Sequence, residues 1–259
     1  MRGPFATGER VLLIDGKDRH YLVTLREGGE FHTHAGITAH DDIIGRPEGI
    51  TARSGTGARY VVVRPTLSDF VLAMPRGAQV IYPKDLGPLL VLADIVPGAR
   101  VLEAGVGSGA LSMALLRAGA EVVGYEVRDD FAAKAQANVA GFLGPGAAYR
   151  VEARDVYDGI VETAVDRVVL DLPEPWRVVG HAEDALEPGG ILVSYLPTIG
   201  QVAQLRERLR ASAFGLARTI EVLERGWHVE GQSVRPDHRM VGHTGFLTSA
   251  RLLGAEQHP

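Results

Sequence analysis

Three glycines occupy alternate positions in this chain, at Gly105, Gly107 and Gly109. An acidic residue, Glu103, precedes them at the end of a short apolar run, and an apolar segment suited to a helix follows them. Glycine tolerates positive φ angles and, having no Cβ, lets a ligand approach the main chain closely. The first N–H groups of the following helix would point at whatever occupies the turn. These residues predict a site for a nucleotide-like ligand.

Two cofactor classes fit this turn. As G-x-G-x-x-A, the residues Gly105, Gly107 and Ala110 match the dinucleotide-binding fingerprint, with Glu126 at roughly the expected spacing of about 20 residues. As E-x-G-x-G-x-G, the same stretch resembles motif I of class I S-adenosylmethionine methyltransferases. That resemblance implies that Glu103 lies near the methionine end of the cofactor and that Glu126 holds its ribose. The turn by itself leaves both classes open.

Polar residues also end the later predicted strands: Glu126, Asp155, Asp171 and Tyr195. In an open α/β sheet, ligands bind beyond the carboxyl ends of the strands. We therefore expect these side chains to meet the glycine turn at one edge of the sheet. The alternative for each of them is a structural cap on the next helix.

Asp171 begins the sequence DLPEPW, residues 171–176. Its two prolines stiffen the turn and remove backbone donors, and Trp176 adds an aromatic face. A rigid carboxylate beside a flat surface suits an adenine whose exocyclic amine must be held. The alternative is a strand that ends at a proline and leads into a helix.

The elements that must position these residues alternate between strand and helix from Gly98 onward, which is typical of a doubly wound sheet. Helices are expected near 111–118, 130–141, 176–187 and 200–212, with strand-like stretches at 220–224 and 244–253 closing the chain. Before residue 66, short strands separated by turns indicate a small β domain, with a hairpin at Gly16-Lys17-Asp18. We predict a small β-rich domain over 1–65, a helical connector over 66–97 and an α/β domain over 98–259.

Composition narrows the class of protein. The chain has 259 residues, 46% of them hydrophobic and 23% charged, as in ordinary globular proteins. It has no cysteine, so disulfides, thiolate metal sites and cysteine nucleophiles are excluded. No apolar run approaches the length of a membrane span, and no leader is visible, so we expect a cytoplasmic protein. The net charge of −5 argues against nonspecific coating of nucleic acid but allows a local RNA site.

Several segments together resemble the bacterial and archaeal tRNA (adenine-58-N1)-methyltransferase family. They cover nearly the whole chain: FHTHAGITAHDDIIG, RGAQVIYPKD, LEAGVGSGAL, DLPEPW, SYLPTIGQV and VGHTGFL. The resemblance implies a class I methyltransferase domain, with a Rossmann-like, mostly parallel seven-stranded sheet, behind a small N-terminal β domain. It also implies S-adenosylmethionine as methyl donor, N1 of adenosine 58 in the tRNA T-loop as acceptor, no metal, and a homotetramer.

The resemblance further implies which residues form the site. Asp171 would lie at the acceptor, with Tyr82 and Tyr195 shaping the target pocket. In this chain, Phe131 stands five positions after Glu126, where the family often has a polar residue. This difference puts one cofactor contact in question. The cofactor-binding set would be Glu103, Gly105, Gly107, Ser108, Gly109, Ala110, Leu111, Glu126, Asp155 and Asp171.

The histidines and basic residues outside these motifs have simpler explanations. Two histidines, His32 and His34, share one side of a predicted strand with His40 nearby, but no carboxylate cluster completes a metal site. We expect them to support turns or lie on the surface. Contacts to RNA phosphates are expected instead from basic residues near the pocket: Lys84, Arg235, His238 and Arg239. The alternative functions are methylation of another RNA position, a small molecule or a protein, and, more distantly, a nicotinamide-dependent oxidoreductase or a tRNA-binding protein without activity.

Overall fold

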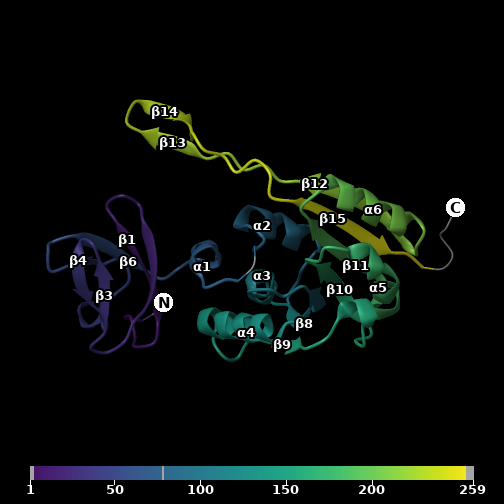
Figure 1. Ribbon diagram of the computed structural model, residues 1–259, viewed down its shortest axis with the longest axis horizontal. Coiled ribbons are helices and arrows are strands. Elements are labelled where there is room, and N and C mark those ends of the chain that lie inside the picture. Colours follow the sequence, from purple (N-terminus) through teal and green to yellow (C-terminus); the bar gives the residue numbers. More distant parts are fainter. Residues whose placement is uncertain (1–2, 78, 255–259) are drawn as a thin grey trace. The chain divides into compact units, whose positions relative to one another are not determined.

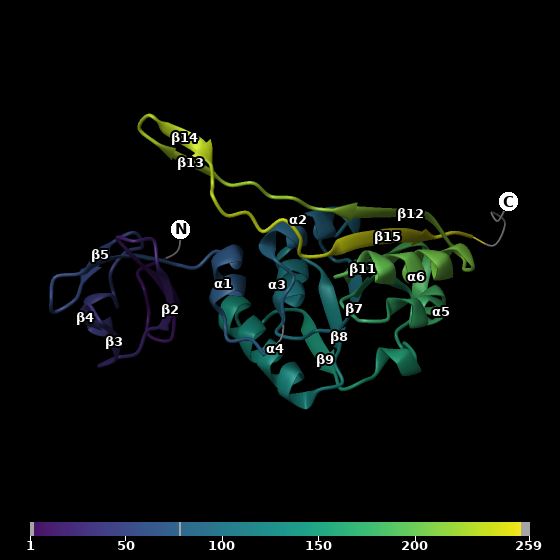
Figure 2. The same ribbon diagram turned by 45° about the horizontal axis from the view of Figure 1, so that its top comes forward.

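The computed structural model describes residues 3–77 and 79–254. They form two compact units, one up to Pro75 and one from Arg76 onward. Figures 1 and 2 show the course of the chain through both. No helix in the described part of the chain is long and apolar enough to cross a membrane.

The first unit is built on a four-stranded antiparallel sheet in the order β2-β1-β6-β5. Its strands are β1 (Arg10–Asp15), β2 (His20–Thr24), β5 (Thr51–Arg53) and β6 (Arg59–Val63). A separate hairpin joins β3 (Glu30–Thr33) to β4 (Gly36–Ala39), a short 3-10 turn follows at His40–Asp42, and α1 (Leu67–Ala73) closes the unit. The expected hairpin is confirmed: Ile14 pairs with His20 across the turn, and Asp15 Oδ1 accepts hydrogen bonds from the N–H groups of Lys17 and Arg19.

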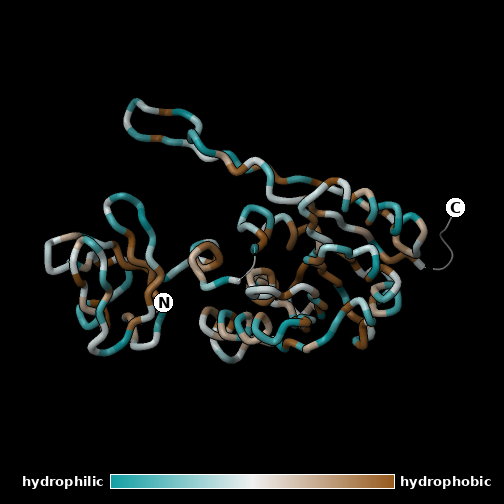
Figure 3. Tube along the Cα trace, viewed as in Figure 1, coloured by the Kyte–Doolittle hydropathy of each residue, from teal (hydrophilic) through white to brown (hydrophobic). Residues whose placement is uncertain are grey.

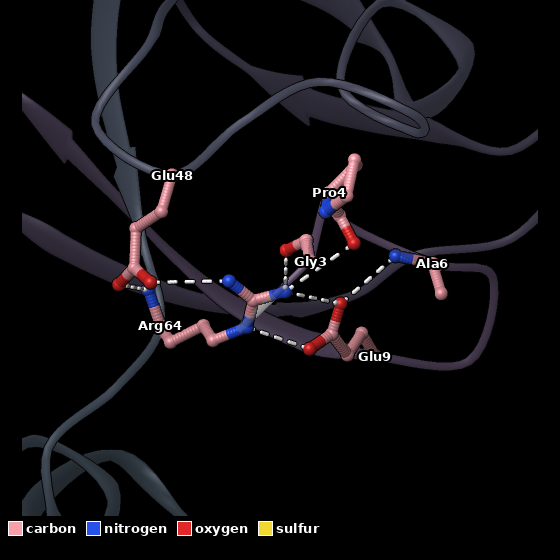
Figure 4. A network of polar contacts seen from close by, with 6 residues as sticks. All are labelled: Gly3, Pro4, Ala6, Glu9, Glu48 and Arg64. Carbon is pink, nitrogen blue, oxygen red and sulfur yellow. Dashed lines mark hydrogen bonds and ion pairs between the residues drawn. The ribbon is translucent and has the colours of Figure 1, made fainter. Parts of the chain in front are cut away.

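A buried arginine ties the ends of this unit together (Figure 4). The guanidinium of Arg64 binds the carboxylates of Glu9 and Glu48 and donates to the carbonyl oxygens of Gly3 and Pro4. Its hydrogen bond with Glu9 is the main reason that the pKa of Arg64 is raised. Because one planar cation satisfies four acceptors, the N-terminal segment is fixed beside the end of β6.

The second unit contains a seven-stranded, mostly parallel sheet in the order β12-β15-β11-β10-β7-β8-β9. Its parallel strands are β7 (Arg100–Ala104), β8 (Glu121–Tyr125), β9 (Tyr149–Glu152), β10 (Val165–Leu170) and β11 (Leu186–Leu196). The last two, β12 (Phe214–Glu221) and β15 (Phe246–Leu252), pair antiparallel with their neighbours. This is the expected class I methyltransferase fold.

Helices cover the sheet in two groups. One group is α2 (Pro83–Leu92), α3 (Ala110–Arg117) and α4 (Asp129–Leu143), which contact one another, β8 and β9. The other is α5 (Val179–Ala185) and α6 (Ile199–Arg210), which pack on β11, β12 and β15. Right-handed crossovers that run in opposite directions from the sheet centre place the groups on opposite faces. Figure 3 shows the hydrophobic positions concentrated between these layers.

Two expected elements differ from the structure in their bounds, and one hairpin was not expected. In place of the helix expected near 176–187, the structure has a short 3-10 turn, Pro175–Arg177, followed by α5. The helix ends at Ala185 because β11 begins at Leu186. The strand expected at 220–224 is β12, which starts at Phe214 and ends at Glu221. The hairpin of β13 (Trp227–Glu230) and β14 (Ser233–Pro236) was not predicted at all, since Gly231 is its only clear turn signal. It projects away from the sheet between β12 and β15 (Figure 1).

Candidate active site

The glycine turn between β7 and α3 has a backbone that other residues would strain. Gly105, Gly107 and Gly109 have φ angles of +84°, +56° and +83°. A Cβ on Gly105 would lie 2.1 Å from the carbonyl oxygen of Asp171, and one on Gly109 would lie 3.3 Å from Ala135. The turn therefore has a left-handed backbone and packs closely against neighbouring backbone. The sequence predicted the positive φ angles from the three glycines.

Glu126, directly after β8, is tied to this turn. Its Oε2 accepts a hydrogen bond from the N–H of Gly107 at 3.0 Å, and its Oε1 accepts one from the N–H of Arg128 at 3.1 Å. The side chain is buried, at 8% exposure. A carboxylate offers about four lone-pair sites, so two acceptor positions remain after these bonds. Glu126 can therefore hold the glycine turn and still accept from ligand hydroxyls.

Glu103 is fully buried in β7, beneath the turn. Neither carboxylate oxygen has a partner in good hydrogen-bond geometry among the described residues, although Ser112 lies close enough to lower its pKa in part. Burial is the larger effect and raises the pKa of Glu103 to about 8, and the charges of Asp171 and Glu126 add to the rise. A buried acid with unsatisfied oxygens is costly, and a cationic or hydrogen-bonding ligand would satisfy it.

A pocket of about 220 Å³ opens at the carboxyl ends of β8 and β10. Asp155 lines it but also caps the 3-10 turn Val156–Asp158, because its Oδ1 accepts a hydrogen bond from the N–H of Tyr157 at 2.9 Å. Asp155 can therefore cap this 3-10 turn and also contact a ligand in the pocket. The lining residues are Gly105, Tyr125, Glu126, Val127, Arg154, Asp155, Val156, Tyr157, Leu172 and Pro173.

Asp171 follows β10 and contacts the glycine turn through its backbone. Its N–H donates to the carbonyl oxygen of Ala104 at 2.9 Å. Desolvation raises the pKa of its half-buried carboxyl to about 7. In the same turn, Trp176 is partly buried and packs against the hydrophobic core.

Two tyrosines lie near Asp171. Tyr195 is near the end of β11, and burial raises the pKa of its hydroxyl to about 12. The charges of Asp85 and Asp171 and the nearby Tyr82 contribute to this rise, so these groups lie within electrostatic range of the Tyr195 hydroxyl. Tyr82 is half-buried and precedes α2 as its N-cap residue. The structure thus brings together Tyr82, Asp171 and Tyr195, whose backbones are far apart in sequence.

A buried ion pair beside these tyrosines was missed. Lys84 Nζ lies 2.8 Å from Asp85 Oδ1 and donates to the carbonyl oxygen of Val222 at 2.7 Å. Asp85 Oδ2 accepts a hydrogen bond from Thr244 Oγ1 at 2.6 Å. The expectation that Lys84 contacts RNA is therefore wrong, because its ammonium is buried and occupied. The only sequence signal was that both residues stand in segments quoted for the family resemblance.

The remaining basic and histidine candidates do not gather at the site. Arg235 lies on β14 of the projecting hairpin, and His238 and Arg239 are exposed in the segment after it. The Nδ1 of His40 accepts a hydrogen bond from the N–H of Arg26, and His32 pairs with Glu30. Within residues 3–77 and 79–254 no three acidic or histidine side chains form a group that could hold a metal ion.

Comparisons with known proteins agree with this geometry. Residues 59–236 match the family described as tRNA methyltransferase complex GCD14 subunit, and residues 3–51 match the TrmI-like N-terminal family. A tRNA (adenine(58)-N(1))-methyltransferase TrmI from Thermus thermophilus is 41% identical over 93% of this chain and 96% of its own.

Two solved structures resemble the whole chain. The tRNA (m1A58) methyltransferase TrmI from Aquifex aeolicus has a TM-score of 0.86 and 30% identity, covering 97% of this chain and all of its own. A SAM-dependent O-methyltransferase from Thermotoga maritima has a TM-score of 0.93 and 30% identity, covering 99% and 97%. With the sequence match extending over both units and the carboxylates gathered at the glycine turn, this chain belongs to the tRNA (adenine-58-N1)-methyltransferase family.

Proposed function

We propose that this protein transfers the methyl group of S-adenosylmethionine to N1 of adenosine 58 in the T-loop of tRNA. The observation that carries the proposal is the position of Asp171. Its backbone contacts the glycine turn, and its half-buried carboxyl lies near Tyr195 on the other side. Asp171 therefore lies between the glycine turn, which would bind the cofactor, and the tyrosine side chain that would contact the acceptor base.

The residues on the glycine side fit S-adenosylmethionine. Glu126 has free acceptor positions for the two ribose hydroxyls, and Asp155 lines the adjoining pocket as a partner for the adenine amine. Glu103, Gly105, Gly107, Ser108, Gly109, Ala110 and Leu111 would surround the methionine part. The orphaned oxygens of Glu103 support this, because the ammonium of that part would satisfy them. When bound, this cofactor supplies an electrophilic methyl group on a sulfonium.

The acceptor side fits an adenine. N1 carries an in-plane lone pair and is neutral at pH 7, so no base is needed to activate it. Aligning it in a dry site supplies most of the catalysis. As positive charge develops on the ring, Asp171 stabilises it and accepts a hydrogen bond from the exocyclic N6–H. Tyr82 and Tyr195 stack on or bond the extruded base, and stacking contributes about 1–3 kcal/mol per base.

We also propose a homotetramer that acts on tRNA in the cytoplasm. Support for assembly comes from the β13–β14 hairpin, which exposes Trp227, Val229 and Val234. Exposed apolar side chains on a projecting element are typical of contact surfaces. A second copy of this chain is the expected partner, and sedimentation velocity of the protein with Trp227→Ser and Val229→Ser tests it.

The function is tested with labelled S-adenosylmethionine and an unmodified tRNA transcript, followed by mapping of the labelled nucleotide. We expect 1-methyladenosine at position 58 and no label in a transcript with guanosine there. Label at another nucleotide would favour a different RNA target. Binding of the cofactor without labelling of any RNA would favour a small-molecule or protein acceptor.

A further inference from the structure

The start of α2 carries a charged pair that is almost completely buried. The side chain of Lys84 is 7% exposed and that of Asp85 is 0% exposed. A buried pair is costly unless its remaining donors and acceptors also find partners. The partners of Lys84 and Asp85 therefore indicate the role of this ion pair.

Both completing bonds reach a single excursion of the chain, residues 222–245, which leaves the sheet after β12 and returns at β15. Lys84 Nζ holds the outgoing leg through the carbonyl oxygen of Val222, at 2.7 Å. Asp85 Oδ2 holds the returning leg through Thr244 Oγ1, at 2.6 Å. Two adjacent side chains therefore fasten both legs of the excursion to the same point of α2.

The returning leg also contacts Tyr195. A Cβ on Gly245 would lie 2.5 Å from Cζ and 2.7 Å from the hydroxyl oxygen of Tyr195, so the Gly245 backbone packs directly on that ring. Thr244 directly precedes Gly245 and gives its single hydroxyl hydrogen to Asp85. The bond to Asp85 therefore holds in place the backbone that packs on the Tyr195 ring.

We propose that Asp85 is a positioning residue for methyl transfer, which acts through Thr244 and the adjoining Gly245 to hold the ring of Tyr195 on the acceptor side. This inference rests on the function proposed above. Lys84 pairs with Asp85 at 2.8 Å, and the carboxyl group of Asp85 in turn orients Thr244. Small displacements of groups that align reactants are expensive, since about 1 Å of misplacement can cost about 10²-fold in rate.

The test compares Thr244→Val, which removes the hydroxyl at nearly constant volume, with Thr244→Ser, which keeps it. We expect Thr244→Val to lower kcat for tRNA methylation at least tenfold, with an unchanged Kd for S-adenosylmethionine. Thr244→Ser should restore kcat to within about threefold of the parent. Thr244→Ala gives a second deletion of the hydroxyl if the valine variant does not fold.

Thr248→Val is the matched control. Thr248 lies in β15 and is more deeply buried than Thr244. Its hydroxyl bonds Thr219 across the sheet at 2.9 Å rather than α2 or Tyr195. We expect Thr248→Val to lower Tm at least as much as Thr244→Val while kcat stays within about twofold of the parent. Equal losses of kcat in the two variants would overturn the proposal.

A double-mutant cycle with Tyr195→Leu, which removes the ring, separates positioning from general structural support. If Asp85 and Thr244 act through the tyrosine ring, Thr244→Val should change kcat less than twofold in the Tyr195→Leu background. Multiplied effects, or a Thr244→Val variant as active as the parent, would show that Asp85 and Thr244 have no positioning role. A parent protein that methylates no tRNA would refute the proposed function instead.

Discussion

The two sides of the site are assembled in different ways. On the cofactor side, Gly107 and Glu126 are 19 residues apart and belong to successive strand–helix units, and backbone N–H groups make the contacts. On the acceptor side, Asp85 and Thr244 are 159 residues apart and meet through side chains. The cofactor side can therefore be recognised from a short sequence motif. The acceptor side forms only when β15 has joined the sheet and brought Thr244 to Asp85. Four predictions test this division, in decreasing order of the change that each should cause.

Asp171→Ala should separate the two sides most strongly. Removing one preorganised electrostatic partner of a developing charge costs about 10²–10³-fold in kcat. Binding of S-adenosylmethionine, measured by calorimetry, should change little because the contact of residue 171 with the glycine turn is through backbone. Asp171→Asn keeps the shape and removes the charge. An alanine variant with near-parental kcat would contradict the assigned role.

Gly105→Ala should damage the cofactor side and reach across to the acceptor side. Its Cβ would lie 2.1 Å from the carbonyl oxygen of Asp171, at a φ of +84°. A clash of this kind with backbone costs about 1–3 kcal/mol in addition to left-handed strain. Thermal unfolding and calorimetric binding should both show the loss.

Gly107→Ala is the control for this prediction. A Cβ at Gly107 would meet only the carbonyl oxygen of Gly105, at 4.0 Å, so left-handed strain is its only expected cost. If both variants lost the same stability, the close approach to Asp171 would have no consequence.

At saturating S-adenosylmethionine, which would pair with Glu103, the pH dependence of kcat should report the acceptor side. The pKa of Asp171 is raised to about 7 by desolvation, and the ionised form is the one that stabilises charge. Activity should therefore rise with pH through about 7, and between pH 8 and pH 6 it should fall about tenfold. Asp171→Asn should remove this dependence. A profile that stays flat over this range in the parent protein would exclude an ionised Asp171 from the reaction.

Glu126→Gln should have the smallest effect, confined to the cofactor side. An amide keeps one acceptor but loses the charge, and charge-assisted hydrogen bonds are roughly twice as strong as neutral ones. We expect the affinity for S-adenosylmethionine to fall about threefold to tenfold, with kcat at saturating cofactor within about twofold. A larger fall in kcat than in affinity would show that Glu126 also shapes the acceptor side.

The sequence predicted the elements of the second unit well because their signals are local. Apolar strands that end in glycine or carboxylate residues marked the class I sheet, and the turn at Gly105–Gly109 was predicted with its left-handed backbone. Asp155 shows what local signals cannot predict, because its carboxylate both caps a 3-10 turn and lines a pocket. The β13–β14 hairpin was missed because it packs against no core that would impose a clear hydrophobic period on it.

By itself, the sequence determined the fold class, the glycine turn and the residue types at the ends of the strands. These follow from φ preferences and hydrophobic periodicity, which act between neighbouring residues. The tertiary structure alone shows that Glu103 lacks partners in good hydrogen-bond geometry among residues 3–77 and 79–254, that Lys84 is buried away from solvent, and that Thr244 bonds Asp85. Burial and long-range hydrogen bonding depend on which distant segments the closed sheet brings together, and no local pattern records that choice.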